Sequence, residues 1–365
     1  MSGRTPPVVS RDEALTRCAG ALLFLLCPAT CGANRRNTRI TVSETVGEAC
    51  PTIHMILYVL NPGLQSRVVD FGRPTSRSLG VPIGGAADRS ALALGNALVG
   101  NPPDAPALEI AMFGPTLRAD AEVGAVVFGA PFDLATDRQA FVAGKSFTLI
   151  PGDVLHVHGT PRGVRAYLCV PGGFDVPTIL NSRSALEPIR AGDHLACRPS
   201  VLPARYLADA TPFALPESPH SLRVLPGAQT DWFPTTELSS LTFRVAPASN
   251  RMGLRLVGQP LTRPAREMVS EPVCPGTVQV ANDGQCIVLG VDGQTIGGYP
   301  KIAQVIQADL DALGQLRPGD LVQFRPVTLA EAEALALARF AALDARLTRI
   351  RTITDCSGPA ADPSL

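Results

Sequence analysis

Lysine is nearly absent from this chain of 365 residues. Lys145 and Lys301 are the two lysines, and the other thirty of the 32 basic residues are arginine. An arginine-rich coding style explains most of this bias, because arginine replaces lysine on most solvated surfaces. It does not replace lysine where a compact ammonium group or a shiftable pKa is needed. The two lysines are therefore informative, above all Lys301, which lies in a glycine-rich segment.

An excess of one charge is also missing. Lys+Arg and Asp+Glu both number 32, so the charge balance gives no basis for binding nucleic acid or an anionic membrane. The apolar run at residues 21–27 is far shorter than the roughly 20 residues of a transmembrane helix. The nine cysteines include no C-x-x-C pair, which argues against a disulfide framework and against a zinc site. We therefore expect a cytoplasmic protein with reduced thiols and no metal.

Three familiar catalytic motifs are incomplete or absent. Gly144-Lys145-Ser146 resembles the end of a Walker A loop, but Gln139 stands where that loop needs a glycine. The sequence contains no G-x-S-x-G nucleophile elbow and no Ala-Met-Lys-Met biotin-attachment context. The chain thus offers no nucleotide cradle, no evident hydrolase nucleophile and no biotinylation site of its own.

What is present is a series of short β-rich runs separated by turns, which predicts a mainly β fold. Three similar turns, each containing Gly-Asp, precede strand-like runs: Gly152-Asp153, Gly192-Asp193 and Gly319-Asp320. A recurrent turn is the simpler explanation, and a duplicated barrel is the alternative. The predicted strands are Ile56–Leu60, Val123–Phe128, Phe147–Ile150, Val154–Val157, Ala166–Val170, Leu241–Val245, Gln279–Val280 with Ile287–Val291, and Leu321–Phe324.

Two helices are predicted from their capping residues. Asp88 can cap a helix over Arg89–Val99 that Gly100 ends, and Thr328 with Glu331 forms a capping box for a C-terminal helix. Residues 1–54 are predicted to be an N-terminal extension that is disordered or results from an overextended gene start, with Met55 as the initiator. The predicted segments after it are a first β module at 55–207, a linker at 208–221, a second β module at 222–327, a helix at 328–350 and a tail at 351–365.

Three segments carry more polar chemistry than a scaffold needs. The first runs from Asp70 and Arg73 to the helix entry at Asp88, where free N–H groups can meet an anion. The second surrounds Arg251, which could bind a carboxylate or phosphate or make a structural ion pair; both interpretations stay open. The third is Gly293-Gln-Thr-Ile-Gly-Gly-Tyr-Pro-Lys301, whose adjacent glycines let backbone N–H groups approach a ligand beside a lysine.

At these segments the sequence resembles the bacterial family of the 5-oxoprolinase C-subunit, also called the KipA or biotin-dependent carboxyltransferase-like family. The similarity runs from about Leu64 to Phe324, and it includes Asn181-Ser-Arg-Ser184 and the segments around Arg251 and Lys301. The resemblance implies two cyclophilin-like β-barrel modules. It also implies partners, the KipI-like B-subunit and the A-subunit of 5-oxoprolinase, with which the chain would open 5-oxo-L-proline to L-glutamate at the expense of ATP.

The resemblance and the residue types together predict a site that the chain shares with its KipI-like partner. We expect some residues to polarise the amide or move protons: Asp88, Gln294, Thr295, Tyr299 and Lys301. We expect others to bind the substrate: Arg73, Arg183, Arg251, Gly297 and Gly298. ATP would act at the level of the complex.

Two alternatives stay open. One is a carboxyltransferase module of a urea or amide carboxylase, for which biotin would be the cofactor. The other is a regulatory binder that sequesters its KipI-like partner without catalysis.

Overall fold

The structure is a computed structural model that describes residues 55–207, 218–234, 237–262 and 265–355. The predicted extension at 1–54, residues 356–365 of the tail predicted at 351–365 and most of the linker at 208–221 lie outside these ranges. Residues 351–355 of the predicted tail continue the C-terminal helix. The last two linker residues, His220 and Ser221, already belong to a strand. No helix in the described ranges is long and apolar enough to cross a membrane.

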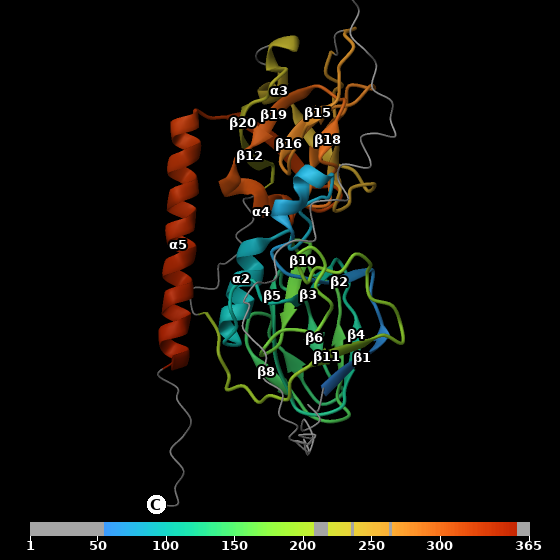
Figure 1. Cartoon of the computed structure of the whole chain (residues 1–365), viewed down its shortest axis with the longest axis vertical. Coiled ribbons are helices and arrows are strands. Elements are labelled where there is room, and N and C mark those ends of the chain that lie inside the picture. The colour runs from blue at the N-terminus through green and yellow to red at the C-terminus, as the bar shows by residue number, and fades with distance from the viewer. Residues whose placement is uncertain (1–54, 208–217, 235–236, 263–264, 356–365) are drawn as a thin grey trace, which may run out of the picture. The chain divides into compact units, whose positions relative to one another are not determined.

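The first β module consists of two antiparallel sheets around one core (Figure 1). One sheet has the order β11-β1-β4-β9-β6-β7 and the other β2-β3-β10-β5-β8. Both sheets contribute alternate side chains to the core, as period-two strands do. The strands are β1 (Met55–Asn61), β2 (Gln65–Val69), β3 (Ala107–Ala111), β4 (Thr116–Ala119), β5 (Val123–Gly129), β6 (Leu134–Ala135), β7 (Ala140–Phe141), β8 (Phe147–Leu149), β9 (Val154–Val157), β10 (Arg165–Cys169) and β11 (His194–Cys197).

The second β module is a closed barrel in the order β12-β19-β16-β17-β14-β13-β20. Phe243 and Phe324 meet edge to face in its core, with ring centroids 5.7 Å apart. The predicted mainly β fold class is therefore confirmed. The barrel strands are β12 (His220–Pro226), β13 (Thr242–Val245), β14 (Gly253–Val257), β16 (Thr277–Val280), β17 (Cys286–Leu289), β19 (Lys301–Val305) and β20 (Leu321–Pro326), and a separate two-stranded sheet pairs β15 (Glu271–Pro272) with β18 (Ile296–Gly297).

Both predicted helices are confirmed with their caps. α2 (Arg89–Leu98) is capped by Asp88, whose Oδ1 accepts from the Ala91 N–H at 2.9 Å. α5 (Leu329–Asp355) opens with the Thr328–Glu331 box, in which each residue bonds the backbone N–H of the other. The remaining short helices are α3 (Glu237–Ser240), α4 (Leu310–Leu313), η1 (Pro74–Leu79), η2 (Thr230–Trp232) and η3 (Gln307–Asp309).

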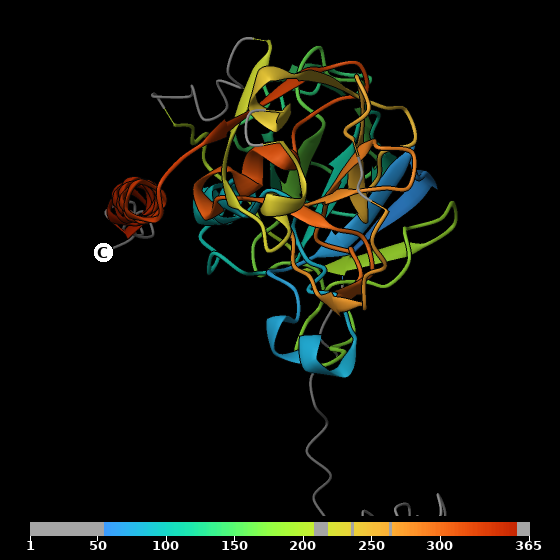
Figure 2. The ribbon, with the colours of Figure 1, turned by 90° about the horizontal axis from the view of Figure 1, so that it is seen from above.

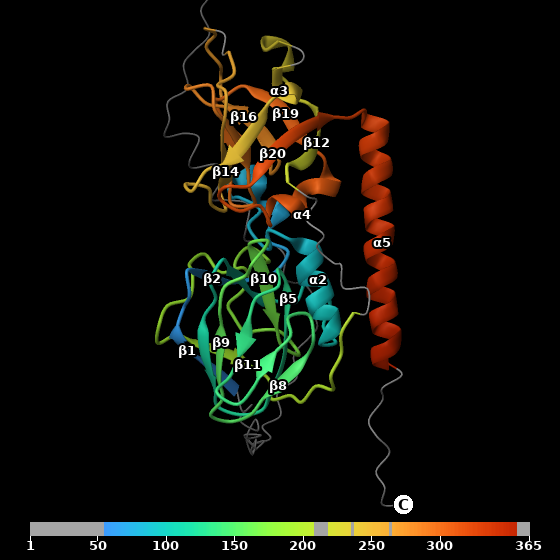
Figure 3. The ribbon, with the colours of Figure 1, turned by 180° about the vertical axis from the view of Figure 1, so that it is seen from behind.

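Helix α2 covers the outer face of the second sheet of the first module (Figure 3). The packing is close at Gly95, where an added Cβ would lie 2.9 Å from Cys169 Sγ and 3.0 Å from Phe128 Cβ. α5 packs against α2 at one end and against η3 and β12 at the other, so it contacts both modules. Seen end on in Figure 2, α5 lies beside the barrel and takes no part in it.

The three Gly-Asp turns share one hydrogen-bond pattern. In each, the aspartate carboxylate accepts from the backbone N–H three residues earlier, at 2.9 Å for Asp153, 2.7 Å for Asp193 and 2.8 Å for Asp320. In each, the aspartate N–H bonds back to the carbonyl of that same earlier residue. The glycines have φ between +86° and +99°, a region that favours glycine. A recurrent turn therefore accounts for the repeated sequence.

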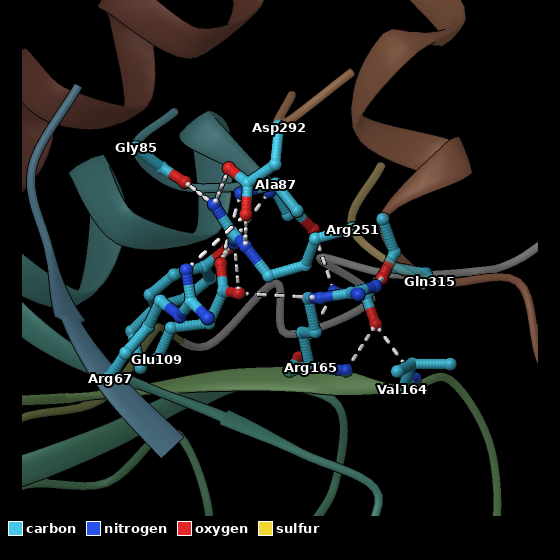
Figure 4. Close-up of polar contacts among 12 residues, drawn as sticks. Arg67, Gly85, Ala87, Glu109, Val164, Arg165, Arg251, Asp292 and Gln315 are labelled. Atoms are coloured by element: carbon cyan, nitrogen blue, oxygen red, sulfur yellow. Dashed lines mark hydrogen bonds and ion pairs between the residues drawn. The ribbon is translucent and has the colours of Figure 1, made fainter. Parts of the chain in front are cut away.

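A buried ion-pair network joins the two modules (Figure 4). Glu109 on β3 pairs with Arg251, which precedes β14. Arg251 also donates to Asp292, from Nε at 2.7 Å and from Nη2 at 2.8 Å, and to the Gly85 carbonyl at 2.6 Å. Arg165 on β10 lies 3.4 Å from Glu109. Arg251 and Glu109 are 5% and 2% exposed, so the pair is cut off from water.

Gln315 adds a second buried link. Its Oε1 accepts from the backbone N–H groups of Val164 and Arg165, both at 3.0 Å, and its Nε2 donates to Asp88 Oδ2 at 2.8 Å. The linked groups come from sequence positions about 150 to 230 residues apart. The two modules are thus fixed together by polar contacts as well as by α5.

Replacing Arg251 by methionine should lower the free energy of unfolding by about 3–5 kcal/mol, because the change leaves the Glu109 carboxylate buried without its main partner. Arg255→Met is the matched control: Arg255 is nearby on β14 and its side chain is exposed, so we expect a change within about 0.5 kcal/mol. Urea unfolding followed by circular dichroism measures both. Equal stabilities for the two variants would show that the network is dispensable.

Candidate active site

Lys301 lies at the start of β19, beside a cavity of about 460 Å³ on the second module. Its Nζ lies 2.6 Å from Glu271 Oε2, and its side chain is only 9% exposed. Hydrogen bonding to Lys301 is the main cause that holds the pKa of Glu271 below its usual range. Lys301 therefore faces a cleft, with its charge balanced by a carboxylate that is 45% exposed.

Two glutamines flank this lysine. Gln229 Oε1 accepts from the Lys301 backbone N–H at 3.0 Å, and its Nε2 lies 3.4 Å from Glu271 Oε2. Gln279 on β16 stands opposite Lys301 in the strand ladder. Both glutamines are buried. Lys301 therefore has Gln229 at its backbone, Gln279 opposite it in the ladder and the Glu271 carboxylate at its ammonium group.

Arg77 brings the first module into the same cavity. It belongs to η1, the light-blue turn that lies next to the second module in Figure 1, and it lines the cavity together with Lys301 and Glu271. One of its terminal nitrogens, Nη2, donates to the carbonyl of Val273. The other, Nη1, is buried without a hydrogen-bond partner in the described residues. An arginine and a lysine thus line one cavity, an arrangement suited to binding a carboxylate.

The glycine-rich loop that ends at Lys301 is bound to the segment that carries Glu271. Thr295 is buried and accepts a hydrogen bond from the Val273 N–H through its carbonyl, and Gly297 pairs with Glu271 in the β15–β18 sheet. Gly298 packs near Ser270, Tyr299 is half-buried, and Gln294 is exposed. The loop thus contacts the segment from Ser270 to Val273, and a role of its residues in a site stays a prediction.

Asp70 organises a second polar cluster, on the first module. Its carboxylate accepts from Gly72 N, Arg183 N and the hydroxyls of Ser182 and Ser184, at 2.6–2.7 Å. Burial alone would raise the pKa of Asp70, but these hydrogen bonds outweigh it and the pKa is lowered. The cluster fixes the backbone of Arg183, whose side chain is exposed.

Arg73 belongs to the same cluster but binds the protein itself. Its Nη2 donates to the Ser184 carbonyl at 2.6 Å and its Nε to the Ile179 carbonyl at 3.3 Å. The side chain is buried, so these contacts fold the 179–184 loop. The geometry thus assigns Arg73 a structural role in this loop.

Arg251 and Asp88 need correction as site residues. The Arg251 guanidinium donates to Glu109, Asp292 and the Gly85 carbonyl, so the geometry supports the interpretation as a structural ion pair. Asp88 has no exposed surface, and both carboxylate oxygens accept internal hydrogen bonds. It cannot exchange protons with a ligand in the Lys301 cavity.

Four residues around the cavity were not predicted from the sequence: Arg77, Glu271, Gln229 and Gln279. Arg77 lies in a polar 3-10 turn three residues before Gly80, and nothing local separates it from other surface arginines. Gln279 is next to Lys301 through the β16–β19 pairing, Gln229 bonds the Lys301 backbone from the turn before η2, and Glu271 reaches its ammonium group from the β15–β18 sheet. A single sequence carries no signal for that proximity.

Comparison with known proteins identifies the family. The sequence model of the family described as "Carboxyltransferase domain, subdomain A and B" matches residues 79–326, about two thirds of the chain. This chain belongs to that family.

Individual relatives fit the same assignment. The chain is 34% identical to the 5-oxoprolinase C-subunit of Haemophilus influenzae over 311 residues, covering 81% of this chain and 98% of that protein. The crystal structure of TTHA0988 matches with a TM-score of 0.69 at 38% identity, covering 75% of this chain and 56% of that one. The crystal structure of the K. lactis urea amidolyase matches with a TM-score of 0.70 at 28% identity, covering 80% of this chain.

The lengths of these relatives differ greatly. The chain spans nearly all of the H. influenzae relative, about half of TTHA0988, and 20% of the urea amidolyase chain. Members of the carboxyltransferase-domain family therefore occur both as separate subunits and within longer proteins.

The buried Asp88 carboxyl should make stability depend on pH. Burial, followed by repulsion from Asp311, raises the pKa of Asp88 to about 8 from a usual 3.8. Between these values the folded chain binds more protons than the unfolded chain, so this group's contribution to stability is present at low pH and is lost as pH rises toward about 8. Asp88→Asn removes this pH-dependent contribution to stability and keeps a good helix cap.

We expect the unfolding free energy of the unsubstituted protein to fall between pH 5 and pH 8 relative to that of Asp88→Asn. Urea titrations of both proteins at the two pH values measure this difference. Comparing the change with pH, and not the absolute stability, cancels any constant cost of the substitution. Parallel pH profiles would show that the Asp88 carboxyl is ionised throughout the range.

Proposed function

We propose that this chain is the C-subunit of an ATP-dependent 5-oxoprolinase, which opens 5-oxo-L-proline to L-glutamate together with the A- and B-subunits. The observation that carries the proposal is the cavity that Arg77 lines together with Lys301 and its ion-pair partner Glu271, at the end of a glycine-rich loop. The similarity to a 5-oxoprolinase C-subunit, over nearly the full length of that relative, also supports the proposal.

The reaction breaks the lactam C–N bond. Water supplies the oxygen of the new carboxylate, the ring nitrogen leaves as the amine of glutamate, and ATP hydrolysis drives the step. In our proposal Lys301 and Arg77 hold the substrate carboxylate, which takes the place of Glu271. Gln294 and the N–H groups of Gly297 and Gly298 would polarise the lactam carbonyl, as oxyanion-binding groups do.

Proton transfer in this scheme falls to Tyr299 or to a group of another protein in the complex, since Asp88 is enclosed. Thr295 would position the loop through its backbone. Arg183 would contribute positive charge from the Asp70 cluster. ATP would bind at the level of the complex, since the chain lacks a complete phosphate-binding loop. The protein would act in the cytoplasm.

A carboxyltransferase module that uses carboxybiotin is the second candidate function. The similarity to the K. lactis urea amidolyase, over 80% of this chain, is the observation that favours it. A neighbouring gene for a biotin carboxylase would support this alternative, whereas neighbouring genes for the A- and B-subunits would support the oxoprolinase. Copurification with the KipI-like partner without any turnover would point instead to a regulatory binder.

The two lysines provide a matched test. Lys301→Met should lower kcat/KM for 5-oxo-L-proline in the reconstituted complex by about 10- to 150-fold, since a hydrogen bond to a charged group contributes roughly 1.5–3 kcal/mol. Lys145→Met changes the other lysine, which is exposed on the first module, and should leave turnover near the level of the unsubstituted complex. ATP-dependent glutamate release is the readout. Equal release by the two variants would remove Lys301 from the site.

A further inference from the structure

Gln279 is a buried amide for which the described residues provide no hydrogen-bond partner. It lies on β16 between Val278 and Val280, which face the barrel core, so its side chain points out of the barrel toward the β15–β18 sheet. It is 1% exposed, and neither Nε2 nor Oε1 has a hydrogen-bond partner in the described part of the chain. Buried amides are almost always paired, so an unpaired one calls for a ligand or another functional reason.

The surroundings of Gln279 place it in the Lys301 site. Lys301 is its partner across the ladder, so the two side chains lie on the same face. Gly297 covers the amide so closely that an added Cβ would lie 2.4 Å from Nε2, so a side chain at that position would require the amide to shift. Arg77 Nη1, at the rim of the adjoining cavity, is also buried and unpartnered among the residues described. The unpaired amide is thus the ladder neighbour of Lys301, and an unpaired arginine nitrogen belongs to a residue that lines the same cavity as that lysine.

The hydrogen-bonding groups of Gln279, Arg77 and Lys301 are complementary to one chemical class of ligand. A glutamine amide offers an N–H donor and a carbonyl acceptor side by side. Their complement is an amide whose own N–H and C=O point to the same side, which a ring enforces and a trans peptide bond does not permit. Arg77 and Lys301 add two donors for a carboxylate.

Resting on the proposed function, we propose that Gln279 is a specificity-determining residue that binds the lactam edge of a ligand whose carboxylate is held by Arg77 and Lys301. The lactam N–H donates to Gln279 Oε1 and the lactam oxygen accepts from Nε2. Urea offers a similar amide edge but lacks the carboxylate, so it would bind Gln279 but not Arg77 and Lys301.

Access to the amide requires the β15–β18 sheet to move. Each of its strands has two residues, and Ile296 on its outer side is 58% exposed. The same sheet carries Glu271, whose ion pair with Lys301 links the sheet to β19. A ligand carboxylate that replaces Glu271 at Lys301 therefore also frees the sheet that covers Gln279.

The test is Gln279→Met in the reconstituted complex, with Gln323→Met, an exposed glutamine of β20, as the control. If Gln279 is only a buried structural residue, removing its unpaired polar atoms leaves KM unchanged. We expect instead that KM for 5-oxo-L-proline rises at least tenfold, while the melting temperature of the variant chain is equal to or above that of the unsubstituted protein. Gln323→Met should keep both values.

Ligand fragments separate the two halves of the site. We expect 2-pyrrolidinone, a lactam without a carboxylate, to lose its competitive inhibition in Gln279→Met, whereas cyclopentanecarboxylate, a carboxylate without a lactam, should inhibit both proteins equally. Gln279→Glu, which keeps the shape but replaces the N–H donor, should also raise KM, and it decides the matter if the methionine variant does not fold.

Failure of this inference differs from failure of the proposed function. An unchanged KM in Gln279→Met, in a complex that turns over 5-oxo-L-proline, overturns the role of Gln279 and leaves the proposed function standing. Absence of ATP-dependent turnover in the unsubstituted complex overturns the proposed function, and the lactam ligand with it.

Discussion

The contact on which the structure depends is the buried ion pair between Glu109 and Arg251. Burial alone would raise the pKa of Glu109, but Arg251 and Arg165, with hydrogen bonds from Ala87 N and Tyr167 Oη, outweigh it and hold that pKa below its usual range. The carboxylate therefore stays ionised at neutral pH. A charged group so well enclosed tolerates only one arrangement of its partners, and those partners come from both modules.

This constraint reaches the proposed active site through Asp292. Asp292 accepts from Arg251 and precedes the glycine-rich loop, and the backbone next to it bonds Gly84 N through Val291 O at 2.9 Å. The segment that contains Arg77 is thereby held beside the second barrel. Arg251 suits the junction of the two modules because its planar guanidinium donates to two carboxylates and a carbonyl at once. The compact ammonium group of Lys301 suits a site where, in our proposal, one carboxylate replaces another.

Local features of the fold followed from the sequence, because their causes are local. The Gly-Asp turns, the Asp88 cap and the Thr328–Glu331 box each depend on residues three positions apart, and all three are found as expected. The strand-like runs were also predicted, as was a helix over residues 89–99, which the structure places over Arg89–Leu98. The family resemblance supplied the barrels and pointed to the loop that ends at Lys301.

The contacts between residues far apart in the chain could not be predicted from the sequence. Arg251 pairs with Glu109 across 142 positions, and the sequence alone left its role open between ligand binding and an internal ion pair. Asp88 looked accessible at a helix entry, but Gln315, 227 positions away, encloses it. The β15–β18 sheet has two residues in each strand, too few for any periodic pattern, so the cover over Gln279 could be recognised only from the structure.

Arg77 of one module and Lys301 of the other form, in our proposal, a single carboxylate-binding site. A crystal structure of the protein together with the other proteins of the complex, bound to 5-oxo-L-proline, would test this point without any intermediate assumption. We expect the ligand carboxylate within about 3 Å of Lys301 Nζ and Arg77 Nη1, a normal length for such hydrogen bonds, with Glu271 displaced. A ligand bound elsewhere, with the Lys301–Glu271 ion pair intact, would disprove the shared site.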